Sequence, residues 1–211
     1  MAEAPTTWTA EPFIPEDRSL ARLEAASKTC RGCPLYASAT QTVFGEGPRS
    51  ARLILVGEQP GDKEDLAGKP FVGPAGRVLD DALVEAGIDR AQTYLTNVVK
   101  HFKWTRAKTG NRRLHAKPTR PEIIACLPWL LAELEALQPD LLVCLGATAA
   151  QALLGSSFRV TKSRGVLLPW PGQPFKILAT IHPSAVLRTR TKEERHEAFA
   201  SLVADLKVAA A

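Results

Sequence analysis

The chain is poor in the features that secreted and membrane proteins depend on. It has only four cysteines in 211 residues, which is few for a disulfide scaffold: Cys30, Cys33, Cys126 and Cys144. It has no apolar run of about 18 residues that could cross a membrane, and its first residues lack the basic and apolar regions of a secretory leader. We therefore expect a cytoplasmic protein without a membrane span, and take a monomer as the starting expectation.

Acidic residues are absent from residues 100–120, KHFKWTRAKTGNRRLHAKPTR, which hold eight Lys or Arg and two of the four histidines. The whole chain has a formal net charge of +5, so the remainder is net negative. Gly, Asn and Pro interrupt the segment, which predicts a loop and not a charged helix. Such a basic loop is typical of a site for a polyanion, above all nucleic acid, although a solvated surface loop has the same composition.

Short apolar runs alternate with stretches of helical periodicity along most of the chain. Strands are predicted at 52–56, 94–99, 140–145 and 176–181, and helices at 18–28, 74–87, 121–137, 147–154 and from about 192. Pro128 should kink or restart the third helix. This alternation predicts a three-layer α/β/α fold around a central, mostly parallel four-stranded sheet. We expect an irregular arm over 1–17 and one domain over 18–211, with the basic loop inserted at about 103–120.

Ligands of such folds bind where strands end in loops at their carboxyl ends. The first such loop, GEQPGDKEDLAGKPFVGPAGRVLD from Gly57, contains neither G-x-G-x-x-G nor a P-loop, so no nucleotide cofactor is expected. Its Glu58 and Asp62 are suited to orienting a nucleophile or water, or to stabilising a cation. The other two loops begin at Asn97 and at His182.

Three motifs together resemble the uracil-DNA glycosylase superfamily, on the iron–sulfur branch called family 4. They are the Gly57 loop, TNVVK at 96–100 and IHPSAVLR at 181–188, and the resemblance covers about residues 28–206. GEQPG, where family 4 has GEAPG, and NRRLHAKP at 111–118 are similar to the X-type members (UdgX), which become covalently attached to DNA after excising uracil. The resemblance implies uracil-containing DNA, single-stranded by preference, as the partner and uracil as the released base.

The resemblance also implies a role for each motif residue. Because a base inside a duplex is out of reach, the nucleotide must be flipped out or read in a single strand. Phe71 would stack on the uracil, Asn97 would read its edge, and His182 would donate to its O2 as negative charge develops. Backbone groups of the pocket would come from Gln59, Pro60, Gly61 and Asp62. Phosphates would be contacted by Arg112, Arg113, Lys117, Ser184 and Arg188.

His115, in RRLHAKP, matches the histidine that attacks C1′ of the sugar in X-type proteins. A neutral imidazole is a nucleophile, and Glu58 would orient it or stabilise the cationic sugar. The bond formed has no evident route to hydrolysis, so each molecule would act once. Three other interpretations stay open: His115 as a phosphate contact, an ordinary multiple-turnover family 4 enzyme, and a metal-stabilised DNA-binding module without chemistry.

Cys30-Arg-Gly-Cys33 is a C-x-x-C motif, which alone indicates zinc, redox thiols or an iron–sulfur cluster. The resemblance implies a structural [4Fe-4S] cluster held by this pair, by Cys126 and by the residue after NVVK. Family 4 has a cysteine there, whereas this chain has His101, as X-type proteins do. Imidazole ligates iron in Rieske centres. Cys144 is a competing ligand, but it lies in an apolar strand where free cysteine is usually inert, and zinc is the alternative metal.

Overall fold

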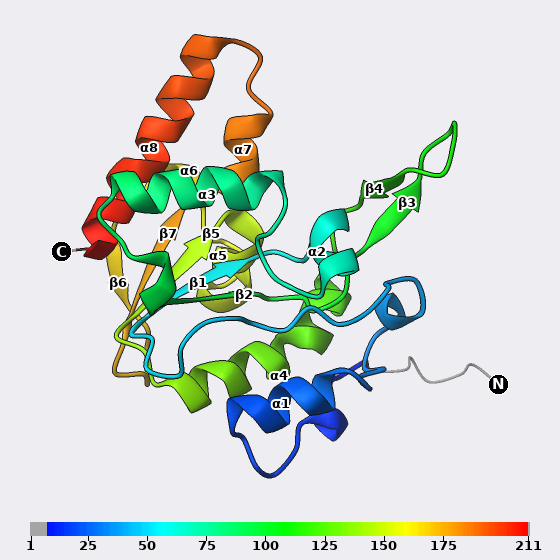
Figure 1. Ribbon diagram of the computed structural model, residues 1–211. Coiled ribbons are helices and arrows are strands. Elements are labelled where there is room, and N and C mark those ends of the chain that lie inside the picture. The colour runs from blue at the N-terminus through cyan, green and yellow to red at the C-terminus, as the bar shows by residue number, and fades with distance from the viewer. Residues whose placement is uncertain (1–7, 211) are drawn as a thin grey trace.

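A computed structural model describes residues 8–210, which form a layered α/β fold (Figure 1). The central sheet has five strands in the order β2-β1-β5-β7-β6. The first four are parallel to their neighbours, and β6 is antiparallel to β7. Their bounds are β1 Leu53–Gly57, β2 Thr93–Asn97, β5 Leu141–Leu145, β7 Lys176–Thr180 and β6 Leu167–Pro169. The predicted α/β fold is confirmed, but the sequence missed β6, because this edge strand is only three residues long, ends at a proline and is largely exposed.

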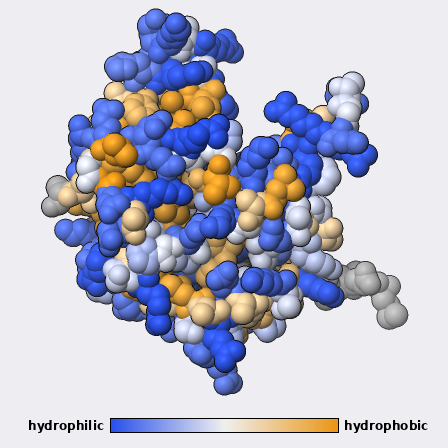
Figure 2. Space-filling view, in the orientation of Figure 1, coloured by the Kyte–Doolittle hydropathy of each residue, from blue (hydrophilic) through white to orange (hydrophobic). Residues whose placement is uncertain are grey.

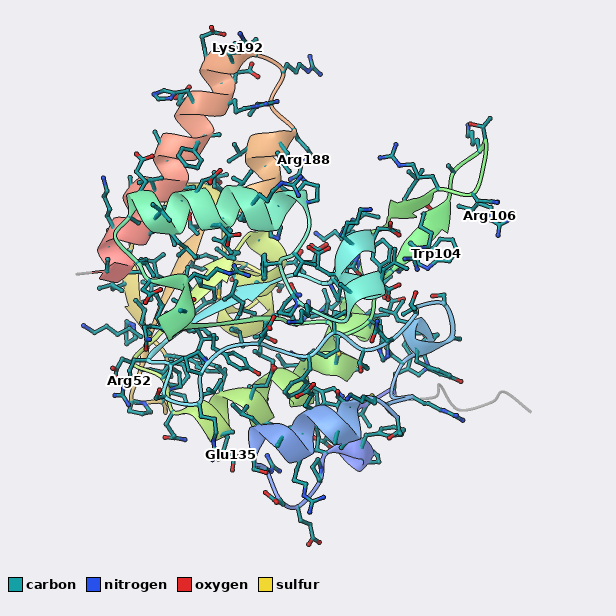
Figure 3. All side chains as sticks on the ribbon, in the orientation of Figure 1. Arg52, Trp104, Arg106, Glu135, Arg188 and Lys192 are labelled. Atoms are coloured by element: carbon teal, nitrogen blue, oxygen red, sulfur yellow. The ribbon has the colours of Figure 1, made fainter. Side chains whose placement is uncertain are left out.

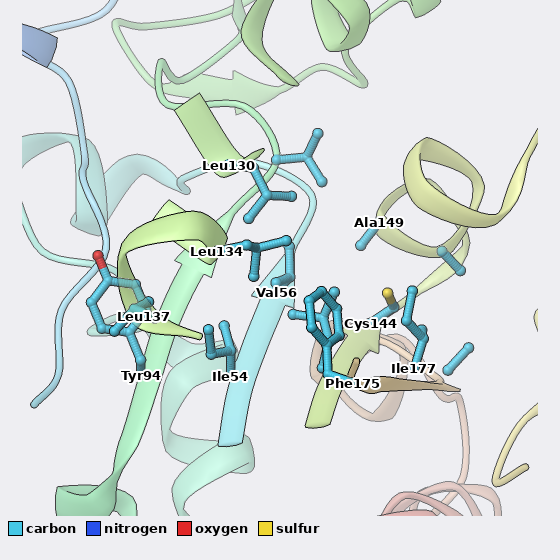
Figure 4. Packing of buried hydrophobic residues seen from close by; sticks show 14 of the residues in the cluster. Ile54, Val56, Tyr94, Leu130, Leu134, Leu137, Cys144, Ala149, Phe175 and Ile177 are labelled. Carbon is cyan, nitrogen blue, oxygen red and sulfur yellow. The ribbon is translucent and has the colours of Figure 1, made fainter. Parts of the chain in front are cut away.

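Alternate residues of the strands face two different hydrophobic layers. Ile54, Val56 and Cys144 pack under α4 (Arg120–Leu137) and α5 (Ala147–Leu154), as Figure 4 shows. Leu55 and Val143 face α3 (Pro74–Glu85) and α8 (Lys192–Ala210) on the other side. This period of two is what a sheet covered on both faces requires.

Shorter elements complete the fold. α1 (Leu20–Ser27) packs against α4 as an outer layer, and α7 (Pro183–Leu187) lies between α3 and α8. The remaining helices are α2 (Asp62–Ala67) and α6 (Val160–Ser163), with 3-10 turns at Glu11–Phe13, Pro34–Ala37 and Arg90–Gln92. Within residues 8–210 no helix is both long and apolar enough to cross a membrane.

Helix α4 runs through Pro128 as one helix, so the restart that the sequence allowed does not occur. It begins with a capping box, in which Thr119 N–H donates to Glu122 Oε2 at 2.6 Å. Pro128 removes one backbone hydrogen bond, but the next two residues, Trp129 and Leu130, are fully buried. We infer that their packing against the core offsets the missing bond.

The basic segment is a β-hairpin, not simply the loop that its composition predicts. β3 (Trp104–Arg106) pairs antiparallel with β4 (Arg113–His115), and Trp104 lies opposite His115. The hairpin projects from the body of the molecule in Figure 1, and the same projection is strongly hydrophilic in Figure 2. Its strands were missed because each is only three residues long and contains no alternating apolar pattern.

The predicted irregular arm lies partly outside the described residues, since 1–7 are not described. Residues 8–17 contain the single turn Glu11–Phe13. Ala10 is buried, and its N–H donates to the carbonyl of Ala125 in α4 at 2.8 Å. This part of the arm is therefore attached to the domain.

Candidate active site

The loops that carry the sequence motifs meet at the carboxyl edge of the parallel sheet. β1 ends at Gly57 and β2 at Asn97, and these two residues are paired in register. Glu58 follows Gly57 directly, and His182 follows the end of β7 by two residues as the N-cap of α7. Because parallel strands end at the same edge, residues distant in the sequence come together there.

Gly57 makes room for two side chains predicted to bind the base. A Cβ atom on Gly57 would lie 2.3 Å from Asn97 Oδ1 and 2.8 Å from Phe71 Cζ. Phe71 has a left-handed backbone with φ of 55°, and its carbonyl oxygen would lie 1.8 Å from a Cβ on Gly76. The ring of Phe71 is stacked with that of His182, with centroids 6.3 Å apart. Asn97, Phe71 and His182 are therefore brought together, as the sequence predicted.

His182 is held as the tautomer with its proton on Nε2. Its Nδ1 accepts the backbone N–H of Ser184 at 3.1 Å and lies 2.8 Å from Ser184 Oγ. Arg188 donates to that same hydroxyl at 2.8 Å, so the hydroxyl proton is free to point at Nδ1. Since Nδ1 is an acceptor, Nε2–H is the donor that His182 offers to a ligand. Figure 3 shows Arg188, predicted as a phosphate contact, at the end of α7.

Burial, together with the charges of Arg188 and His115, lowers the pKa of His182 to about 4. The unfolded chain binds a proton on this residue near its ordinary pKa of 6.5, whereas the folded chain does not. Stability should therefore fall as pH falls from 6.5 toward 4. We expect the free energy of unfolding to depend less on pH in His182→Gln than in the wild type over this range, measured by urea titration. Parallel pH curves for the two proteins would contradict this pKa.

Glu58 connects the hairpin to the sheet edge. Its Oε1 lies 3.5 Å from His115 Nε2, and its Oε2 accepts a hydrogen bond from the Thr148 hydroxyl. The side chain of His115 is 51% exposed, against 19% for Glu58, so the imidazole can be reached by a large ligand. The sequence reasoning missed Thr148, although it lies just after the end of β5, where the strand-end rule points.

The side chain of Gln59 joins both strands of the hairpin to the sheet edge. Its Nε2 donates to the carbonyls of Lys103 and Ala116 at 3.2 and 3.1 Å, and its Oε1 accepts the N–H of Lys103 at 3.0 Å. Gln59 is only 7% exposed. The sequence assigned it a backbone role in the pocket, but its amide also holds Ala116, which follows His115, and Lys103, which precedes the cross-strand partner Trp104.

Arg113 anchors the hairpin to helix α2. Its Nε donates to Asp62 Oδ1 and its Nη1 to Asp65 Oδ2, both at 2.6 Å. The guanidinium also lies over the rings of Phe102 and Trp104, and its side chain is 16% exposed. Arg113 therefore anchors the hairpin, and the phosphate contact predicted for it stays a prediction. The carboxylate of Asp62, which the sequence suited to orienting a nucleophile or stabilising a cation, binds Arg113 in the structure.

The other predicted contact residues lie in the hairpin and at the start of α2. Arg112 and Lys117 are exposed at the tip and the base of the hairpin. Pro60 is buried, and Gly61 is the N-cap of α2.

Replacing Gln59 with alanine should loosen the hairpin, because three hydrogen bonds to its base are lost. At roughly 1 kcal/mol for each bond, local opening should increase at least about tenfold. Amide hydrogen exchange across 103–116 measures this opening. Gln151→Ala is the matched control, since that amide contacts Phe158 away from the hairpin. Equal exchange in both variants would contradict the bracing role.

Three of the four predicted metal ligands are buried in one apolar cluster. Cys30, Cys33 and Cys126 are 7%, 6% and 3% exposed, and all pack in the cluster that contains Trp129. The indole N–H of Trp129 donates to Cys30 Sγ at 3.3 Å, and the N–H of Lys100 donates to Cys126 Sγ at 3.2 Å. Burial raises the pKa of Cys126 to about 12 and also raises that of Cys33. These thiols are therefore protonated at neutral pH unless a metal binds them.

The fourth predicted ligand, His101, is also buried, and burial lowers its pKa to about 4, which keeps the imidazole neutral. Within residues 8–210, however, no group of three or more His, Cys, Asp or Glu lies close enough to hold a metal ion. Cys144 is fully buried in a different hydrophobic cluster, under α4 and α5, and does not lie with the three remaining cysteines.

Comparison with known proteins identifies the relatives of this chain. Residues 44–207 match the family model of the uracil DNA glycosylase superfamily. A type-4 uracil-DNA glycosylase from Thermotoga maritima is 43% identical over 169 residues, which cover 80% of this chain and 83% of that protein. One from Archaeoglobus fulgidus is 36% identical over 179 residues, covering 81% and 85%. A third, from Pyrobaculum aerophilum, is 36% identical over 175 residues, covering 80% and 85%. Through its fold, its strand-end motifs and these matches, the chain belongs to the uracil DNA glycosylase superfamily.

Proposed function

We propose that this protein is a uracil-DNA glycosylase that excises uracil from DNA and then becomes bonded to the abasic site through His115. The observation that carries this proposal is the pair formed by His115 and Glu58, with Nε2 and Oε1 3.5 Å apart. The hairpin that brings the histidine to the base pocket is fastened by Gln59 and Arg113. A solvated basic loop would need neither fastening.

The base pocket supports cleavage of the glycosidic bond. Asn97 reads the uracil edge with its amide, and Phe71 stacks on the ring. As the bond between N1 and C1′ breaks, its electron pair leaves with the uracil, and His182 stabilises the resulting anion by donating from Nε2 to O2. The tautomer of His182 and its lowered pKa suit this role, since the ring is a neutral donor at pH 7.

Capture of the sugar follows. The C1′ cation is stabilised by the Glu58 carboxylate, and a ring nitrogen of His115 donates its lone pair to C1′. The imidazole becomes a cation in forming this bond and then loses its other ring proton, which neutralises the uracil anion. No water enters the product, and no hydroxide is released. The hydrogen bond from Thr148 holds Glu58 in place for this step.

An ordinary enzyme that turns over is the second candidate, favoured by the names of the relatives, which are type-4 uracil-DNA glycosylases. In that case water captures C1′ and His115 contacts DNA. Single-stranded DNA containing one uracil distinguishes the candidates when it is incubated with the protein and separated by denaturing electrophoresis. Our proposal predicts a band of covalent protein–DNA complex, with at most one DNA strand bound to each protein molecule. Abasic DNA in excess over protein, without such a band, would reject covalent capture, and intact DNA would reject the enzyme altogether.

We also propose that Cys30, Cys33, His101 and Cys126 hold a [4Fe-4S] cluster with a structural role. Supporting this are the burial of the three thiols in one cluster and the N–H donors on two of their sulfurs, which suit thiolates bound to iron. The cluster would tie the segment of Cys30 to α4 and to the loop after β2, and it supplies no step of the reaction.

The cluster proposal predicts about four iron and four sulfide per purified protein, measured by chemical analysis and visible absorption. Cys30→Ser should lower the iron content, whereas Cys144→Ser, in the other hydrophobic cluster, should not. His101→Cys should retain iron, since a thiolate replaces the imidazole. Purified protein with zinc and no iron would overturn the assignment.

A further inference from the structure

A groove opens between α4 and α5 beside the candidate active site. It encloses about 380 Å³, a volume at the lower end of the range for small-molecule sites. Ile123, Ile124 and Leu127 of α4 and Ala152 of α5 give it an apolar surface, and Thr148, Gln151 and Ser156 add polar groups on the α5 side. The proposed reaction uses only Thr148 at the inner end of this groove, and no role has been assigned to the apolar surface.

The groove is continuous with the reactive pair. Thr148 lines it, and the hydroxyl of that same residue donates to Glu58, whose other carboxylate oxygen faces His115 at 3.5 Å. Lys117 also lines the groove and lies two residues after His115 in the hairpin base. A ligand in the groove would therefore lie next to the nucleotide that reacts.

The chemistry of the groove matches a nucleotide. Ile124 is 55% exposed and leaves an apolar surface that a ring can cover. Lys117 and Arg120, both exposed, place two positive charges on the rim. A base with an apolar face, joined to a phosphate, complements an apolar floor with a cationic rim.

We propose that this groove binds the nucleotide next to the excised uridine in single-stranded DNA. The base lies on Ile124 and Leu127, and its phosphate faces Lys117 and Arg120. This inference rests on the proposed function, because it takes its occupant from the same strand. It predicts that the enzyme also contacts the base next to the uracil. Any of the four bases should satisfy this contact, but an abasic position should not.

The test is a binding cycle on single-stranded DNA in which the target is 2′-fluoro-2′-deoxyuridine. The fluorine disfavours the C1′ cation and keeps the glycosidic bond intact, so fluorescence anisotropy reports binding without reaction. One neighbouring base at a time, on the 5′ or the 3′ side, is replaced by an abasic spacer. For the wild type we expect the Kd to rise about tenfold for the spacer on one side only, because the apolar surface of the groove loses the base that covers it.

Ile124→Asn should raise the Kd of the normal strand by a similar factor and should abolish the sensitivity to that spacer. The control is Val84→Asn, at a 79% exposed position of α3 on the other face of the sheet. This control also places an asparagine inside a helix, so it has a similar effect on helix stability, and it should bind DNA like the wild type. The proposal would be overturned if neither spacer changed the Kd of the wild type. It would also be overturned if the spacer raised the Kd of Ile124→Asn as much as that of the wild type.

A separate assay of uracil release from ordinary uracil-containing DNA keeps the two proposals apart. If the wild type releases uracil but Ile124→Asn does not change the effect of the spacer on the Kd, only the groove assignment fails. If Ile124→Asn abolishes the effect of the spacer but the wild type releases no uracil, the groove binds DNA and the proposed reaction fails.

Discussion

Replacing His115 with alanine should eliminate the covalent complex with uracil-containing single-stranded DNA while uracil is still released. The imidazole is the group we propose to bond to C1′, and without it the space beside Glu58 admits water. Glu58, Asn97 and His182 remain to stabilise the departing base and the sugar cation. We expect the denaturation-resistant band to fall by at least about a hundredfold, because a direct nucleophile has no substitute in the pocket.

Release should also change from one uracil per protein to many. Free uracil measured against protein concentration gives this stoichiometry directly. His196→Ala is the matched control, since it removes an exposed histidine of α8 and should cross-link like the wild type. If His115→Ala still forms the band, another residue is the nucleophile, and if it releases no uracil, His115 acts in bond cleavage itself.

The strand-end motifs were predictable because their placement follows from one rule. Parallel strands finish at one edge, so Glu58, Asn97 and His182 could be brought together from the sequence without knowing any contact. The rule would also have found Thr148, after β5, had the strand predicted at 140–145 been treated like the other three. What no local pattern reveals is which side chains contact each other there.

The basic segment shows this limit. Its charge predicted DNA contact for the whole stretch, but the structure separates its cations by their partners. Lys100 is buried against Glu133, Lys103 pairs with Glu122, and Arg113 pairs with two aspartates of α2. The partners come from distant segments, so counting charge along the sequence could not detect them. The cations of the segment that are exposed are Arg106, Lys108, Arg112, Lys117 and Arg120.

The buried pair of Lys100 and Glu133 should be the most costly of these contacts to break. Their side chains are 1% and 0% exposed. The ammonium group donates to Glu133, to Thr96 Oγ1 at 2.6 Å and to the carbonyl of Asn97 at 2.8 Å. Glu133 Oε1 also accepts from the Tyr94 hydroxyl at 3.0 Å, and burial, then the charge of Glu133, raises the pKa of that phenol.

Lys100→Met should lower the free energy of unfolding by about 3–5 kcal/mol, because it leaves the Glu133 carboxylate buried without its cation. That is a large part of the roughly 5–15 kcal/mol that stabilises a typical domain. Urea unfolding measures the loss. The surface pair Arg18–Glu135, with side chains 48% and 58% exposed, provides the control, and Arg18→Met should cost less than about 1 kcal/mol.

The double variant Lys100→Met with Glu133→Leu separates the charge from the packing. If the cost of the single variant comes from an unpaired carboxylate, removing that carboxylate should restore most of the stability, and the two changes should be far from additive. Additive losses would mean that the two side chains contribute independently. Lys100 also holds the carbonyl of Asn97 and donates its N–H to Cys126. A double variant that is stable but binds uracil poorly would therefore show that this ion pair positions Asn97 as well as stabilising the core.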